Sequence, residues 1–238
     1  MRPAGVLVAS ERLRRILATL SAGGDEEVSA RRLCETANAV LRVNGTGVML
    51  MSTDVAYGSL CTTNEVSERI EELQYSLGEG PCVDAYNHDR VIAEPDLADP
   101  ATARWAAFTP PALQSGVRAV FAFPLRVGAA RLGALDLYMD RPGPLSDDQH
   151  ADALVISDVV ASWLFGTQAA ASPGKLGVGI DASADFHLMV HNAAGMVSVQ
   201  LGVSVTEAML RLRAYAFSHE RPLTSVAEDI VARRLRFD

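Results

Sequence analysis

Apolar residues recur at helical spacing near the start of the chain. Residues 5–20 carry Leu13, Ile16, Leu17 and Leu20, which recur at helical spacing, and residues 26–42 carry a similar stripe. One apolar face on an otherwise polar segment is typical of an amphipathic helix that packs on a core. The pattern therefore predicts two helices before the first strand.

The hydrophobic pattern then changes to runs typical of strands. Residues 45–52 and 56–63 are predicted to pair across turn residues at 52–55. Residues 117–127 and 130–139 form the clearest hairpin, and their partly alternating pattern fits a sheet covered by helices. These segments predict an antiparallel sheet.

Further elements are expected around this sheet. A helix is predicted at about 65–75, a short strand at 91–97, and a helical stretch that starts at 104–108 and ends before the proline pair at 110–111. A long helix at 146–165 has two aspartates in its first turn, which suit the positive end of the helix dipole. Helices combined with an antiparallel sheet predict an α+β domain.

The composition changes after residue 165. Residues 166–185 are rich in Gly, Ala and Ser, which indicates a linker between a domain at 11–165 and a second one at 186–238. The last segment predicts an all-α bundle of three short amphipathic helices, with a capping box at Ser204–Glu207 and Pro222 opening the third helix. The expected buried stripes are Val190, Ala193, Ala194, Val197 and Leu201; Val205, Ala208, Met209, Leu212 and Ala216; and Leu223, Val226, Ala227 and Ile230.

The bulk composition narrows the functional classes. A formal net charge of -8 and a pI of about 5.1 argue against broad, nonspecific binding of nucleic acid, so any such site must be local. Three cysteines without paired spacing are expected to be reduced thiols. No signal-peptide core and no apolar run of membrane-spanning length is present, which predicts a cytoplasmic protein without membrane contact.

The last fifty residues resemble the ANTAR family. Its motifs match Ala193, Gly195 and Met196 on the first helix, then Ala208, Leu212, Arg213 and Ala216 on the second, and Leu223, Val226 and Ala227 on the third. Where many members have a Lys before the first-helix Gly, this chain has Ala194. The resemblance implies an RNA-binding transcription antiterminator that recognises stem-loops in a nascent transcript.

Residues 11–165 resemble a GAF domain of the kind found beside ANTAR modules in actinobacteria. The resemblance is carried by the strand at 45–52, the hairpin at 117–139 and the LGEGPC stretch. It implies a sensor for a small molecule or redox signal, or a platform for a homodimer. The candidate sensor loop consists of Gly78, Glu79, Gly80, Pro81 and Cys82; the cofactor, if there is one, is unknown.

Arginines are the candidate RNA contacts in the C-terminal segment. Stem-loop RNA is recognised through loop bases and backbone shape, which requires a few cations on a rigid face. The candidates are Arg211, Arg213, Arg221, Arg233 and Arg234, with Arg213 favoured. The alternative interpretation is that these arginines are solvated helix faces or dipole partners.

No catalytic or metal site is predicted. His187 and His191 are spaced like two zinc ligands, but the intervening residues lack the catalytic Glu of H-E-x-x-H and no third ligand is evident. The expectation is a non-enzymatic regulator in which a GAF-like sensor controls an RNA-binding module. Two alternatives remain: a DNA-binding regulator, and a ligand-binding sensor or enzyme whose helical tail only mediates dimerisation.

Overall fold

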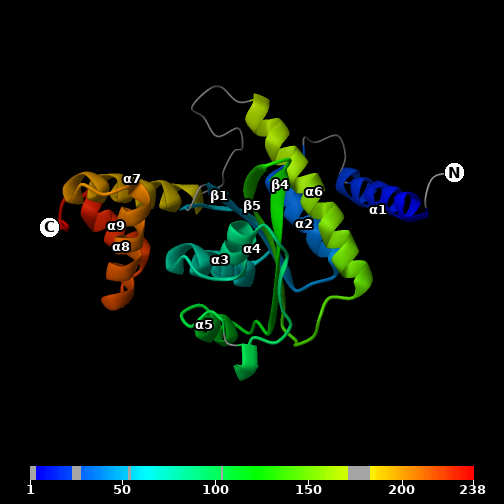
Figure 1. The fold of residues 1–238 in the computed structure, drawn as a ribbon, viewed down its shortest axis with the longest axis horizontal. Helices are drawn as coiled ribbons and strands as arrows, with labels where there is room; N and C mark the ends of the chain where they lie inside the picture. The colour runs from blue at the N-terminus through cyan, green and yellow to red at the C-terminus, as the bar shows by residue number, and fades with distance from the viewer. Residues whose placement is uncertain (1–3, 23–27, 53–54, 103, 171–182) are drawn as a thin grey trace.

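The computed structural model describes residues 4–22, 28–52, 55–102, 104–170 and 183–238 (Figure 1). Its elements, in chain order, are α1 (Ala4–Ser21), α2 (Ala30–Leu41), β1 (Gly45–Ser52), β2 (Val55–Thr62), α3 (Glu65–Leu77), α4 (Pro81–His88), β3 (Ile92–Glu94), a 3₁₀ turn (Pro100–Thr102), α5 (Thr109–Gln114), β4 (Ala119–Val127), β5 (Ala130–Met139), α6 (Asp147–Ala170), α7 (Ser183–Leu201), α8 (Val205–Ser218) and α9 (Leu223–Val231).

The strands form one antiparallel sheet in the order β2-β1-β5-β4-β3. The predicted pairs β1–β2 and β4–β5 are both present, and β1 joins them by pairing with β5, with Val48 opposite Leu135. Residues 53–54 of the expected turn lie outside the described residues. The predicted α+β arrangement, an antiparallel sheet with flanking helices, is confirmed.

Alternate strand residues supply two apolar layers, one on each face of the sheet. Val48 and Phe123 belong to the core under α1, α2 and α6, whereas Met49 and Ala122 belong to the core under α3 and α4. Figure 1 shows these two groups of helices on opposite sides of the strands. We call α1–α6 with the sheet the N-terminal domain.

Helices α7–α9 pack together as a small unit, here called the C-terminal bundle. The expected stripes are buried, including Ala194, except that Leu201 is only partly buried and Val205 is 46% exposed. Ser204 caps α8 by accepting the amide hydrogen of Glu207. Bundle residues belong to the same apolar cluster as Met49 and Tyr75, so the core under α3 and α4 continues into the bundle.

Several predicted boundaries need correction. Helix α6 runs to Ala170 and α7 begins at Ser183, so both enter the segment expected to be a linker, of which residues 171–182 lie outside the described part. Residues 104–108 are not helical as expected: α5 begins at Thr109, and the proline pair lies in its first turn, where a missing amide hydrogen costs little. Pro222 is the residue before α9 and not its first residue.

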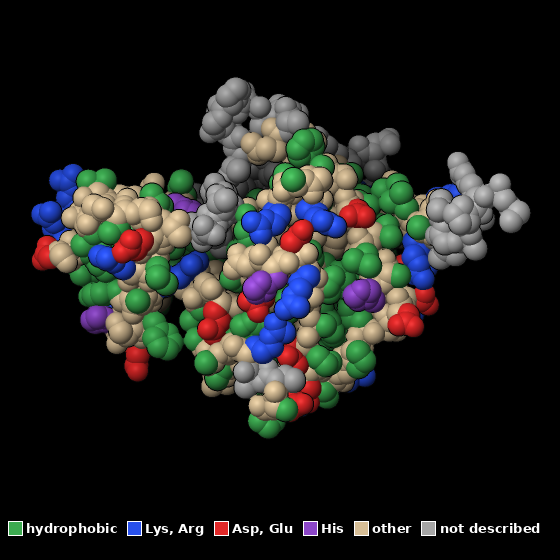
Figure 2. Space-filling view, in the orientation of Figure 1, with side chains coloured by type: hydrophobic (Ala, Val, Ile, Leu, Met, Phe, Trp, Pro, Cys, Tyr) green, Lys and Arg blue, Asp and Glu red, His purple; other side chains and the backbone are tan. Residues whose placement is uncertain are grey.

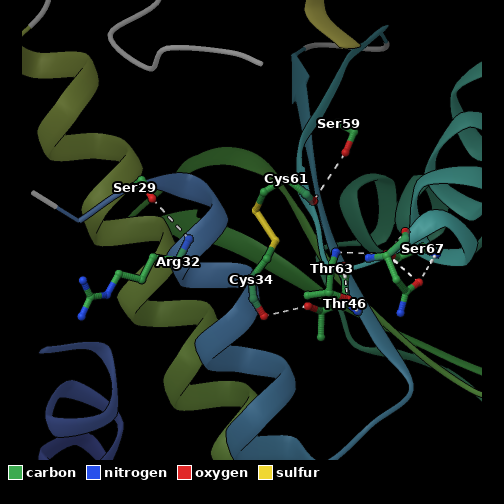
Figure 3. Close-up of a disulfide and its surroundings, with 9 residues drawn as sticks. Ser29, Arg32, Cys34, Thr46, Ser59, Cys61, Thr63 and Ser67 are labelled. Atoms are coloured by element: carbon green, nitrogen blue, oxygen red, sulfur yellow. Dashed lines mark hydrogen bonds between the residues drawn. A yellow bond between two sulfur atoms is a disulfide. The ribbon is translucent and has the colours of Figure 1, made fainter. Parts of the chain in front are cut away.

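Cys34 and Cys61 form a disulfide, which corrects the expectation of free thiols (Figure 3). The bond joins α2 to β2 across 27 residues, with a Cα–Cα distance of 6.2 Å that lies within the usual disulfide range. Sequence spacing gave no sign of the pair because the two residues approach only when α2 packs on the sheet. Cys82 is a buried free thiol.

By length and apolar character, no single helix in the described part of the chain qualifies as a membrane span. The bent pair Leu188–Leu201 and Val205–Ser218, which meet at 105°, passes that test only when the two are taken together.

Candidate functional site

The predicted sensor loop is a tight connection between α3 and α4. Gly78 ends α3 in the left-handed conformation at φ 65°, and Gly80 precedes α4 at φ 137°, a region that favours glycine. Pro81 and Cys82 lie in the first turn of α4, so these two residues are helical and not part of a loop.

Glu79 braces this connection against the segment before α5. Its Oε1 accepts the amide hydrogens of Ala107 at 2.6 Å and Phe108 at 2.9 Å. Two charge-assisted hydrogen bonds to one carboxylate oxygen fix the geometry of the segment. The carboxylate of Glu79 is therefore engaged within the fold.

The Cys82 thiol lies in the closed interior behind the connection. Its side chain is fully buried, and its amide donates to Oε1 of Gln74 at 2.8 Å. Burial, with the nearby carboxyls of Asp136 and Glu71, raises the pKa of the Cys82 thiol well above its usual value. Because the thiolate is the reactive form, this environment makes Cys82 a poor oxidant sensor.

Two buried carboxyl groups meet beside this thiol. Glu71 on α3 is 1% exposed and Asp136 on β5 is 5% exposed. Nε2 of Gln74 donates to Oδ2 of Asp136 at 3.0 Å, while Oε2 of Glu71 and Oδ1 of Asp136 have no protein hydrogen-bond partner. The backbone of β1 approaches so closely at Gly47 that a Cβ there would lie 2.4 Å from Oε1 of Glu71.

Both carboxyls of this pair lose their protons less readily than carboxyls in water. Burial, followed by the charge and hydrogen bond of Asp136, raises the pKa of Glu71 well above its usual value. Burial also raises the pKa of Asp136 to about 6, although hydrogen bonds from Glu71, Gln74 and Cys82 oppose this. Because two adjacent buried carboxylates repel each other, the pair favours one shared proton over two negative charges.

Little empty space remains around this pair. The cavity lined by Glu71, Gln74, Asp136 and Tyr138 has a volume of about 10 Å³, roughly that of one water molecule. The protein's own side chains therefore fill the space between the sheet and α3. Neither carboxyl was predicted as a site residue, although Asp136 is the one acid in the apolar strand at 130–139 and was the available signal.

Arg213, the favoured RNA contact, points inward. Its Nε and Nη2 donate to the carbonyl oxygen of Tyr75 at 3.1 and 2.7 Å, and its Cζ lies 5.9 Å from the centre of the Tyr75 ring. Its guanidinium also occupies the space beside Gly78. The expectation that Arg213 reaches solvent freely is wrong, because α8 packs against α3.

Of the other candidate arginines, three are exposed on the bundle and Arg221 is partly buried. Arg211 pairs with Glu207 at 2.6 Å, and Arg221 and Arg234 share Asp229 at 2.6 and 2.8 Å. Arg233 is exposed, and it has no ion-pair partner among the described residues. Figure 2 shows Lys and Arg side chains gathered at the outer end of the bundle, near the C-terminus.

No metal centre is found in the described part of the chain. Within it, no group of three or more His, Cys, Asp or Glu side chains is placed to hold an ion. The side chain of His187 lies outside the described residues, while the ring of His191 packs edge-on against Tyr75 with centroids 6.4 Å apart.

The comparisons with known proteins agree on the N-terminal domain. A GAF domain of a phosphoenolpyruvate-protein phosphotransferase from Acinetobacter superposes with a TM-score of 0.52 at 12% identity, covering 71% of this chain and 98% of that one. The corresponding GAF domain from Coxiella burnetii gives a TM-score of 0.51 at 14% identity, covering 68% and 95%. These likenesses show a shared fold. A search of curated proteins gave no match.

A family model described as GAF domain matches residues 24–157, from just before α2 into α6. The matched span contains the whole sheet, the buried carboxyl pair and the connection at 78–82. GAF domains are typical of proteins that sense signals. On the sheet order, the flanking helices and this match, the chain belongs to the GAF family.

Proposed function

We propose that this protein is a cytoplasmic regulator that acts by binding and not by catalysis, in which the GAF domain controls an RNA-binding C-terminal bundle. Its role is transcription antitermination through stem-loops in a nascent transcript. The observation that carries the proposal is the contact between Arg213 and Tyr75, because it links an ANTAR-like motif residue directly to helix α3 of the sensor.

The outer end of the bundle supports the RNA-binding part. Arg233 and Arg236 are exposed and have no ion-pair partner among the described residues, and Arg234 has to share Asp229 with Arg221. Local cations on a rigid helical scaffold suit the backbone of a folded RNA. The acidic remainder of the chain disfavours binding elsewhere.

The contact at Arg213 supports control by the sensor. A change in α3 that moves the Tyr75 carbonyl would alter how the bundle sits, because two hydrogen bonds and a ring contact connect them. A signal received by a homodimeric GAF domain would act on RNA binding through this contact.

The test is binding of the purified full chain to a fluorescent paired stem-loop RNA, with duplex DNA of equal length as competitor, across a salt series. Replacing Arg233 and Arg236 together by Gln is expected to weaken RNA binding at least about tenfold and to reduce its salt dependence. Arg141→Gln is the matched control, since its side chain is 82% exposed on the N-terminal domain.

Arg213→Gln separates two roles for that residue. If the contact with Tyr75 restrains the bundle, the variant binds RNA more tightly than wild type; if Arg213 contacts RNA, the variant binds more weakly. Preference for the duplex DNA would support the alternative of a DNA-binding regulator. Absence of binding to either nucleic acid would overturn the proposal and leave a ligand sensor whose tail mediates dimerisation.

A further inference from the structure

A groove lies beside the contact between the C-terminal bundle and helix α3. It has a volume of about 840 Å³, within the range of roughly 300–1,000 Å³ typical of small-molecule sites, which often lie between domains. Figure 2 shows the hollow between the bundle at the left and the rest of the molecule. Its apolar lining comes from Leu73 and Leu77 of α3, Leu210, Ala214 and Phe217 of α8, and Leu223 of α9.

The α8 side of the groove leaves large apolar side chains uncovered. Leu210 is 65% exposed and Phe217 is 67% exposed, although both lie on a helix whose opposite face is packed. Covering apolar surface is favourable at about 25 cal/mol per Å². The groove is therefore suited to the apolar body of a ligand.

Arg213 supplies the polar end of the groove. Its Nε and Nη2 both donate to the Tyr75 carbonyl, which leaves Nη1 without a hydrogen-bond partner among the described residues. Burial lowers the pKa of Arg213, and no carboxylate in the described part of the chain forms an ion pair with it. A partly buried cation without a counter-ion favours an anionic ligand.

The other charged groups of the lining are already matched or lie in water. Arg221 pairs with Asp229 at 2.6 Å, and Ser76 donates to the exposed Glu72 at 2.8 Å. Glu220 is exposed as well, so solvent screens its charge. The partly buried charge without a counter-ion is thus positive, while the two carboxylates of the lining are exposed to solvent.

We propose that this groove binds a small amphipathic carboxylate. The carboxylate accepts a hydrogen bond from the guanidinium of Arg213, and the acyl or aryl body lies against Leu73, Leu77 and Phe217. Such a ligand contacts the GAF domain and the bundle at once and is separate from the closed cavity at Glu71. The inference does not depend on RNA binding.

The probe is octanoate, titrated into the full chain by calorimetry at low millimolar concentration, with octanamide and octylamine as neutral and cationic counterparts. We expect octanoate to bind at least about tenfold more tightly than either, because only octanoate gains a charge-assisted hydrogen bond. Equal binding of all three, or no detectable binding of octanoate, would overturn the proposal.

Two variants locate the site. Ala214→Trp fills the groove from an exposed position on α8 and is expected to abolish octanoate binding, while Val199→Trp on α7, at a position 84% exposed, leaves it unchanged. Arg213→Met is expected to bring octanoate down to the affinity of octanamide. Circular dichroism verifies that each variant is folded. Full octanoate affinity in a folded Ala214→Trp variant would place the ligand elsewhere and refute the inference.

Discussion

The buried carboxyl pair makes the stability of this protein depend on pH in an unusual direction. In most folded proteins, paired carboxylates have lowered pKa values and stability falls in acid. Here burial raises the pKa of Glu71 well above its usual value and that of Asp136 to about 6. Replacing Glu71 by Gln keeps the shape and a hydrogen-bond donor but removes the need for a proton.

The magnitude follows from the linkage between proton binding and folding. The unfolded carboxyl of Glu71 loses its proton near its ordinary pKa of about 4.3, whereas the folded one keeps it to a higher pH. Between these two values the native state holds one extra proton, so its contribution to stability falls by about 1.4 kcal/mol for each pH unit. The wild type loses this stability over the pH interval between the two values, and Glu71→Gln is spared the loss.

The assay is urea unfolding of wild type and variant at pH 5.5, 6.5 and 7.5, at constant ionic strength. The difference in unfolding free energy, variant minus wild type, is expected to grow in favour of the variant as the pH rises, by at most about 1.4 kcal/mol per pH unit. Glu72→Gln is the control. The side chain of Glu72, which follows Glu71 in the sequence, is exposed, so the unfolding free energy of this variant is expected to stay within about 0.5 kcal/mol of wild type at every pH.

Two results would contradict this reasoning. A difference that does not change with pH would mean that Glu71 binds its proton equally well in the folded and unfolded chain. A variant that becomes less stable than wild type as the pH rises would mean that the fold requires a negative charge on Glu71, with the proton on Asp136 or absent.

Three further predictions concern stability. Cys34→Ser opens a disulfide that spans 27 residues and is expected to lower the unfolding free energy by about 3 kcal/mol; reductant should lower wild type equally and the variant not at all. Gly78→Ala adds a Cβ 2.6 Å from Nη1 of Arg213 at a residue with φ 65°, whereas Gly128→Ala, its control, has a similar φ of 59° and open space around the added Cβ. In urea unfolding, Gly78→Ala is expected to lose about 1–2 kcal/mol more than Gly128→Ala, because the added Cβ disturbs the contact between Arg213 and α3. Equal losses in the two variants would exclude that contact. Ser204→Ala removes the α8 cap and is expected to cost about 1 kcal/mol in the same assay; no loss would show that the cap is dispensable.

Local pattern predicted the elements better than it predicted their ends. The hairpin at 117–139 and the buried stripe on α9 follow from side-chain periodicity, which the structure preserves. Helix α6 extends past residue 165 because Ala and Gln favour helix, although the composition around them is typical of a linker. A segment's composition therefore indicated the linker only approximately.

The site was less predictable because its residues meet through tertiary packing. Glu71 and Asp136 are 65 positions apart and come together only when α3 lies on β5 and β1. The helical periodicity placed Arg213 next to the buried face of α8, but it could not show that α3 packs against that position. The pairing of Cys34 with Cys61 was hidden for the same reason, since no spacing rule relates a helix to an edge strand.

The shared apolar core has a consequence for how the chain unfolds. Tyr75 and Met49 of the N-terminal domain lie in the same cluster as Val190 and Met209 of the bundle, so separating the two units exposes apolar surface on both. The bundle and the α3 side of the sheet therefore form one cooperative unit. A ligand that binds only the sensor would therefore protect the amide hydrogens of α7–α9 from exchange. If the chain were cut within residues 171–182, each of the two pieces would be less stable than it is in the intact protein.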